Sequence, residues 1–121
     1  MAKKILIVDD SKTMRDMVSF TLKSAGFEVK EAEDGNRAVE ALKDFQSDLI
    51  ITDLNMPGMD GFGLIEHVRA NPQYKYVPIL MLTTESDGQK KERGKAVGAT
   101  GWIVKPFNPE KLVQIINKVC P

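Results

Sequence analysis

Residues 5–11 of the chain read Ile-Leu-Ile-Val-Asp-Asp-Ser, an apolar run that is followed directly by two carboxylates and a serine. A short run of isoleucine, leucine and valine is typical of a strand that is buried on both faces of a sheet. The residues after Ser11 show helical spacing, and a serine at that position can cap the first turn. The stretch therefore predicts a strand, an acidic turn and a helix.

Further apolar runs lie at residues 27–29, 49–51, 79–82 and 102–104, of which the first and the last are weaker. Segments with helical spacing separate these runs and follow the last one. We expect helices from the cap at Ser11 to the stop at Gly26, around residues 38–42, around residues 64–68 with an end at Pro72, over about 86–97 with a stop at Gly98, and from Asn108 to Val119. Strands joined by helices are normally parallel, so this alternation predicts an α/β fold with helices on both faces of a parallel sheet.

Composition argues against several classes of protein. The 121 residues suit a single domain that spans residues 1–121. Seventeen basic residues balance seventeen acidic ones, unlike in a protein that binds nucleic acid through bulk positive charge. One cysteine, Cys120, and one histidine, His67, exclude a disulfide framework and a zinc site built from several such residues. No signal peptide or membrane-spanning stretch is visible, so we expect a cytoplasmic protein that does not bind membranes.

Charged and hydroxyl side chains follow four of the five apolar runs directly. Ligands of an open parallel sheet bind beyond the carboxyl ends of its strands, so these residues should meet at one edge. The residues are Asp9, Asp10, Asp53, Thr83 and Lys105. Three carboxylates at one edge repel one another unless a cation lies among them, and Mg²⁺ prefers oxygen ligands of this kind. The pattern favours a site for a metal ion and a phosphoryl group, with Asp53 as the nucleophile that forms an acyl phosphate.

Each of these residues has an ordinary explanation when it is taken alone. Asp9 and Asp10 could cap a helix, and Asp53 could be a plain residue of a loop after a strand. A lysine such as Lys105 is most often solvated, and a threonine such as Thr83 often ends a strand. The interpretation as a reactive site depends on their meeting at one edge.

Four sequence stretches together resemble the receiver domain of two-component response regulators. They are Ile7-Val-Asp-Asp-Ser11, Asp53-Leu-Asn-Met-Pro-Gly-Met-Asp-Gly61, Thr83 and Lys105-Pro-Phe107. The likeness spans the whole chain and is greatest to the stand-alone chemotaxis regulators of the CheY type. It implies a flavodoxin-like fold, with five parallel strands in the order 2-1-3-4-5 and five helices on both faces of the sheet.

The resemblance also implies a role for each site residue. Asp53 would accept the phosphoryl group. Mg²⁺ would be the cofactor, held by Asp10 and Asp53, by the backbone carbonyl of Asn55, and through water by Asp9. Thr83 and Lys105 would contact the phosphoryl oxygens, and the peptide bond before Pro106 would be cis.

Four positions would govern the response in such a domain. The Thr83 hydroxyl would move toward the phosphate, and an aromatic ring on the fifth strand, here Trp102, would move inward. Asn55 and Glu85 would control the access of water and thereby tune dephosphorylation. The family usually has tyrosine or phenylalanine at position 102, so an indole packed permanently against the fourth helix is the alternative to a moving ring.

The functional expectation is a phosphorylation-activated signalling switch that works as a monomer. A histidine kinase would donate the phosphoryl group, and the output would be a contact with a protein such as a flagellar motor switch component. This contact would use the fourth helix, fifth strand and fifth helix. A phosphatase is a further expected partner, and nucleic acid is not. The chain would be no enzyme apart from catalysing its own phosphorylation and autodephosphorylation. The alternative is a phosphate sink or relay receiver without a motor target.

Two other classes fit the residues less well. A flavin-binding protein with a similar layered fold should offer hydroxyls and backbone amides after the first strand, where Asp9 and Asp10 would repel a phosphate. A phosphohydrolase with Asp53 as nucleophile would usually have a second aspartate two residues later, where this chain has Asn55.

Overall fold

A computed structural model describes residues 2–121 and confirms the predicted α/β fold. The elements in chain order are β1 (Lys4–Val8), α1 (Lys12–Ser24), β2 (Glu28–Ala32), α2 (Gly35–Asp44), β3 (Leu49–Thr52), α3 (Gly61–Ala70), a 3₁₀ turn η1 (Pro72–Tyr74), β4 (Ile79–Thr83), α4 (Gly88–Val97), β5 (Gly101–Val104) and α5 (Pro109–Val119). The strands form one parallel sheet in the expected order β2-β1-β3-β4-β5.

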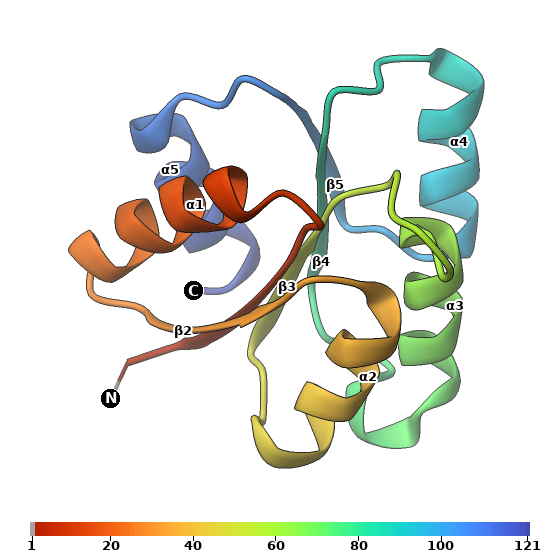
Figure 1. The fold of residues 1–121 in the computed structure, drawn as a ribbon, viewed down its shortest axis with the longest axis horizontal. Coiled ribbons are helices and arrows are strands. Elements are labelled where there is room, and N and C mark those ends of the chain that lie inside the picture. Colours follow the sequence, from red (N-terminus) through yellow and green to blue (C-terminus); the bar gives the residue numbers. More distant parts are fainter. Residues whose placement is uncertain (1) are drawn as a thin grey trace.

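Helices cover both faces of this sheet, α1 and α5 on one side and α2, α3 and α4 on the other (Figure 1). Side chains alternate across a strand, so each central strand contributes to two cores. In β1, Ile5 and Ile7 pack with residues of α1 and α5, whereas Leu6 and Val8 pack with residues of α2 and α3. Burial on both faces explains why the central strands are continuous apolar runs.

Several boundaries differ from the sequence-based prediction. The second strand covers residues 28–32 rather than 27–29, because it lies at the edge of the sheet and is largely exposed, which leaves it little apolar signal. The fourth helix begins at Gly88 rather than near Ser86. The Asp87 carboxylate accepts hydrogen bonds from the backbone N–H groups of Gln89 and Lys90, and thereby caps the helix one residue before its start.

The third helix ends at Ala70, two residues before the predicted stop at Pro72, which begins η1. Several other predicted ends are confirmed. Ser11 caps α1 by accepting a hydrogen bond from the Met14 N–H group. Gly26 and Gly98 follow α1 and α4 with φ values of 94° and 115°, which is the left-handed region that ends helices. The peptide bond before Pro106 is cis, as the family resemblance implied. Between residues 2 and 121, none of the helices combines the length and the hydropathy that a membrane crossing requires.

Arg69 of α3 links three segments near the amino ends of β4 and β5, at the opposite end of the strands from the acidic turn. Its guanidinium donates hydrogen bonds to the carbonyl oxygen of Gly98, at 2.8 and 3.2 Å, and to that of Val77, at 2.6 Å. Longer bonds reach the carbonyls of Tyr74 and Lys75. One side chain therefore links α3, the loop before β4 and the end of α4.

Replacing this guanidinium should destabilise the fold. We expect Arg69→Met to lower the free energy of unfolding by about 2–3 kcal/mol, because several partly buried carbonyl oxygens lose a charged donor. Urea unfolding measures the change. Arg37→Met is the control, since Arg37 is exposed and makes only surface ion pairs with Glu33 and Asp34, which contribute less than about 1 kcal/mol. An equal loss in both variants would contradict the role of Arg69.

Candidate functional site

The carboxyl ends of β1 and β3 bring three aspartates together. β1 and β3 are neighbours, and their register pairs Val8 with Thr52, so the residues that follow them lie side by side. The Asp9 N–H group donates to the Ala32 carbonyl, and the Asp53 N–H group donates to the Val8 carbonyl. These backbone bonds continue the strand ladders into the site and fix where each side chain begins.

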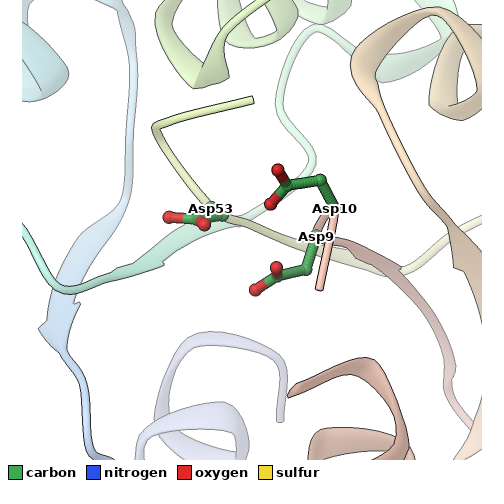
Figure 2. Close-up of side chains that lie close together, drawn as sticks. All are labelled: Asp9, Asp10 and Asp53. Carbon is green, nitrogen blue, oxygen red and sulfur yellow. The ribbon is translucent and has the colours of Figure 1, made fainter. Parts of the chain in front are cut away.

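The side chains of the three aspartates lie close together (Figure 2). Asp9, Asp10 and Asp53 each offer one oxygen that lies within 4.8 Å of the others. Asp9 and Asp53 are buried, and Asp10 is exposed. The predicted acidic cluster is therefore present, with one member open to solvent.

Lys105 supplies the positive charge of the cluster. Its Nζ atom lies 2.7 Å from Oδ2 of Asp9 and 3.3 Å from Oδ2 of Asp53. All three side chains are about nine-tenths buried, with exposed fractions between 5% and 11%. Desolvation of these charges is costly, and the two short ion pairs offset that cost.

Backbone groups hold the remaining oxygens of the two buried carboxylates. Oδ1 of Asp9 accepts from the Ser11 N–H group at 2.9 Å, and Oδ1 of Asp53 accepts from the Leu54 N–H group at 2.7 Å. In each carboxylate, one oxygen thus accepts a hydrogen bond from a backbone N–H group and the other pairs with the Lys105 ammonium. Among the described residues 2–121, the Lys105 ammonium contacts these two carboxylates and not Asp10.

This donor set fits a divalent cation. Mg²⁺ takes oxygen ligands at about 2.0–2.1 Å in an octahedron and usually keeps several waters. Ligands on opposite sides of such an ion are about 4 Å apart, so oxygens within 4.8 Å of one another can share one ion after small movements. Three carboxylates with one ammonium leave an excess of negative charge, which a cation would neutralise.

The other predicted residues lie at or near the same edge. Thr83 ends β4, is fully buried, and accepts a hydrogen bond at Oγ1 from the Glu85 N–H group. The backbone N–H of Lys105 donates to the Thr83 carbonyl, so the strand ends that carry these residues are joined. Asn55 lies two residues after Asp53 and is exposed.

Glu85 and Trp102 form a second group, which is linked to the site through the loop after Thr83. The Lys90 ammonium lies 2.9 Å from the Glu85 carboxylate, and this hydrogen bond is the main reason that the pKa of Glu85 is lowered from its usual value. The indole N–H of Trp102 donates to the Glu85 backbone carbonyl at 2.9 Å. Trp102 therefore contacts the loop rather than the acidic cluster.

Arg15 belongs to the surroundings of the site and was not predicted. Its guanidinium donates to the Asp9 carbonyl at 2.6 Å and pairs with Glu31 at 3.4 Å, and its side chain is only 14% exposed. The signal was available in the sequence, because Arg15 is aligned with Val18 and Leu22 on the apolar stripe of the first helix. A charged residue on such a stripe is normally paired.

The charge imbalance leads to a stability prediction. We expect Asp10→Asn to raise the melting temperature in EDTA by about 2–4 °C, because one of three mutually repelling carboxylates loses its charge. The same change should weaken Mg²⁺ binding at least about tenfold, since one of the three carboxylates that could hold the ion is altered. Thermal melts with and without Mg²⁺ measure both effects. Asp16→Asn makes the same change on the exposed surface of α1, where Lys12 pairs with Asp16, and should not raise the midpoint. An unchanged or lower midpoint for Asp10→Asn would count against the cluster.

Comparison with known proteins places this site in a family. The model of the response regulator receiver domain matches residues 5–117. The chemotaxis protein CheY-3 of Vibrio cholerae is 41% identical over 117 residues, which cover 96% of this chain and 90% of that protein. The phosphate regulon transcriptional regulatory protein PhoB of Escherichia coli is 39% identical over 119 residues, which cover 98% of this chain and 52% of that longer protein.

Solved structures show the same likeness. The crystal structure of the Vibrio cholerae chemotaxis protein CheY4 at low pH superposes with a TM-score of 0.95 at 53% sequence identity, over 98% of this chain and 99% of that one. The acidic cluster, its buried lysine and these likenesses over nearly the whole length have one explanation: the chain belongs to the family of response regulator receiver domains.

Proposed function

We propose that this receiver domain is a phosphorylation-activated switch that accepts a phosphoryl group on Asp53 from a histidine kinase. Receiver domains are signalling modules rather than classical enzymes, and they bind Mg²⁺ at an acidic pocket. The observation that carries the proposal is the buried ion pair between Asp53 and Lys105, at the acidic edge that Asp9 and Asp10 complete. It joins a nucleophilic carboxylate to a cation that can stabilise a transferring phosphoryl group.

The transfer itself requires little from the protein beyond orientation and charge. A carboxylate oxygen of Asp53 attacks phosphorus, and the bond from phosphorus to the imidazole nitrogen of the donor histidine breaks. The electron pair of that bond goes to the imidazole, and the product is an acyl phosphate on Asp53. Lys105 pairs with a phosphoryl oxygen, and the Thr83 hydroxyl turns from its contact with the Glu85 N–H group to donate to another. When it is bound by Asp9, Asp10, Asp53 and the Asn55 carbonyl, Mg²⁺ supplies further charge neutralisation.

Loss of the phosphoryl group depends on the access of water to the acyl phosphate. Asn55 follows Asp53 closely and is exposed, and Glu85 lies in the loop after Thr83. We assign these two residues to the tuning of autodephosphorylation. The pairing of Glu85 with Lys90 supports this role, because it holds the carboxylate in one place and in its charged form.

The output surface consists of α4, β5 and α5. α4 carries Lys90, Lys91, Arg93 and Lys95 against the single acidic residue Glu92. Lys91, Lys95 and Trp102 line a cleft of about 280 Å³ on this surface. An acidic segment of a partner would complement it. Because several relatives are chemotaxis proteins, a flagellar motor switch component is the proposed partner.

A sink for phosphoryl groups is the second candidate. It is favoured by the contact of Trp102 with the fourth helix, since a ring that cannot move would weaken an output that depends on its movement. The cytoplasmic location, the monomeric state and a phosphatase as a further partner remain predictions from the sequence.

Phosphorylation can be tested directly on the purified protein. With Mg²⁺ and a small phosphodonor such as acetyl phosphate, intact mass spectrometry should detect one phosphoryl adduct, because Asp53 and Lys105 provide the nucleophile and the countercharge. Asp53→Asn and wild type in EDTA should show none, whereas Asp16→Asn should react normally. Absence of the adduct from the wild type, or its persistence in Asp53→Asn, would refute the proposed site.

The output contact needs a separate experiment. A pull-down with the protein in Mg²⁺ and beryllium fluoride, compared with Mg²⁺ alone, should enrich a partner with an acidic binding segment. The double variant Lys91→Glu, Lys95→Glu should lose this partner and still form the phosphoryl adduct. Lys43→Glu on α2 is the matched control and should retain the partner. Absence of any phosphorylation-dependent partner, together with drainage of a shared kinase, would favour the sink.

A further inference from the structure

The indole of Trp102 lies against a position of α4 that has no room for a side chain. A Cβ atom placed on Gly94 would be 2.8 Å from Cζ3 and 3.1 Å from Cε3 of the indole. Carbon atoms in favourable contact are about 3.5–4.0 Å apart. Only glycine at position 94 therefore lets the ring occupy this place.

Other contacts hold the ring from two further directions. The indole N–H donates to the Glu85 carbonyl at 2.9 Å, which ties the ring to the loop between β4 and α4. The ring of Phe62 on α3 lies 6.5 Å away between centroids at a tilt of 35°. The guanidinium of Arg93 on α4 lies over the same phenyl ring, 4.3 Å from its centroid. A rotation of the indole would break its hydrogen bond and leave the glycine uncovered.

The fourth helix depends on this contact because its own sequence offers little else to bury. It reads Gly-Gln-Lys-Lys-Glu-Arg-Gly-Lys-Ala-Val, and Gly94 is its one buried residue, all of the helix lying within the described part of the chain. Val97, at its last position, is half-buried. The apolar surface that attaches the middle of α4 thus comes mainly from β5, through Trp102, and from α3, through Phe62.

We propose that Gly94 and Trp102 are a matched pair that locks the indole onto α4. The Glu85 carbonyl, the indole and α4 then move as one unit, and Trp102 is a positioning residue for α4 instead of a ring that turns independently. The lock is a property of the fold. Its consequence for signalling rests on the proposed function, because a movement of the loop after Thr83 would be passed to α4 through the Trp102 hydrogen bond.

A double-mutant cycle tests the lock without any phosphorylation. Alanine normally favours a helix over glycine, so an unhindered Gly→Ala change should raise stability. We expect Gly94→Ala to lower the melting temperature when Trp102 is present and to raise it in the Trp102→Ala background, where the added methyl group finds space. Gly88→Ala is the matched control, since nothing lies within 4 Å of a Cβ at that position of the same helix. Its shift should be the same in both backgrounds. A Gly94→Ala shift that is also the same in both would overturn the lock.

Fluorescence of the single tryptophan tests whether the unit holds during activation. Acrylamide quenching is measured with Mg²⁺ before and after addition of beryllium fluoride, and ¹⁹F NMR of the same samples reports whether the fluoride adduct forms. The lock predicts unchanged quenching in the wild type when the adduct is present, and stronger quenching in Gly94→Ala from the start. Altered quenching of the wild type on adduct formation would overturn the proposal. Absence of the adduct would refute the proposed phosphorylation site, while the double-mutant cycle would still decide the lock.

Discussion

The buried ammonium of Lys105, shared by Asp9 and Asp53, is the interaction on which the arrangement of the site depends. Lys105 follows β5, which is the last strand of the sheet. Asp53 follows β3 and Asp9 follows β1, and β4 lies between β5 and these two strands. Only a long side chain can span that separation while its apolar stem stays buried. The strand order therefore decides that a lysine, and no shorter cation, neutralises these carboxylates.

The same geometry leaves an excess of negative charge at the carboxyl ends of the strands. Both faces of the sheet are covered by helices and packed with apolar side chains, so the ends of the strands are where charges can gather. Three carboxylates and one ammonium leave net negative charge around Asp53. Phosphorylation would replace the single negative charge of the Asp53 carboxylate by about −1.5 to −2 on the phosphoryl group, which the ammonium alone would not offset. A divalent cation, which receiver domains bind at an acidic pocket, would neutralise this excess of negative charge.

Much of the site could be predicted because each charged residue directly follows an apolar run, and a parallel sheet places all such residues at one edge. The fold was equally accessible, since strands buried on both faces carry a strong apolar signal. Features that depend on neighbours distant in the sequence, or on which of two adjacent residues caps a helix, were harder to foresee. The edge strand β2 has little to bury, Asp87 competes with Ser86 for the start of α4, and the bond from Arg15 to the Asp9 carbonyl needs the folded turn.

The contact between Gly94 and Trp102 belongs to that second group, and it explains how so polar a helix is held in place. A helix that packs through its own apolar residues needs an apolar stripe, and the positions of that stripe are then not available for charged side chains. Here the large apolar side chain lies on β5, and at this contact the helix contributes the space left by a glycine. The four basic side chains of α4 can therefore all remain exposed to solvent. As a consequence α4 and the loop after Thr83 are not independent, because one indole packs against the helix and donates a hydrogen bond to that loop. A change in that loop and a change in the position of α4 are thereby made a single event.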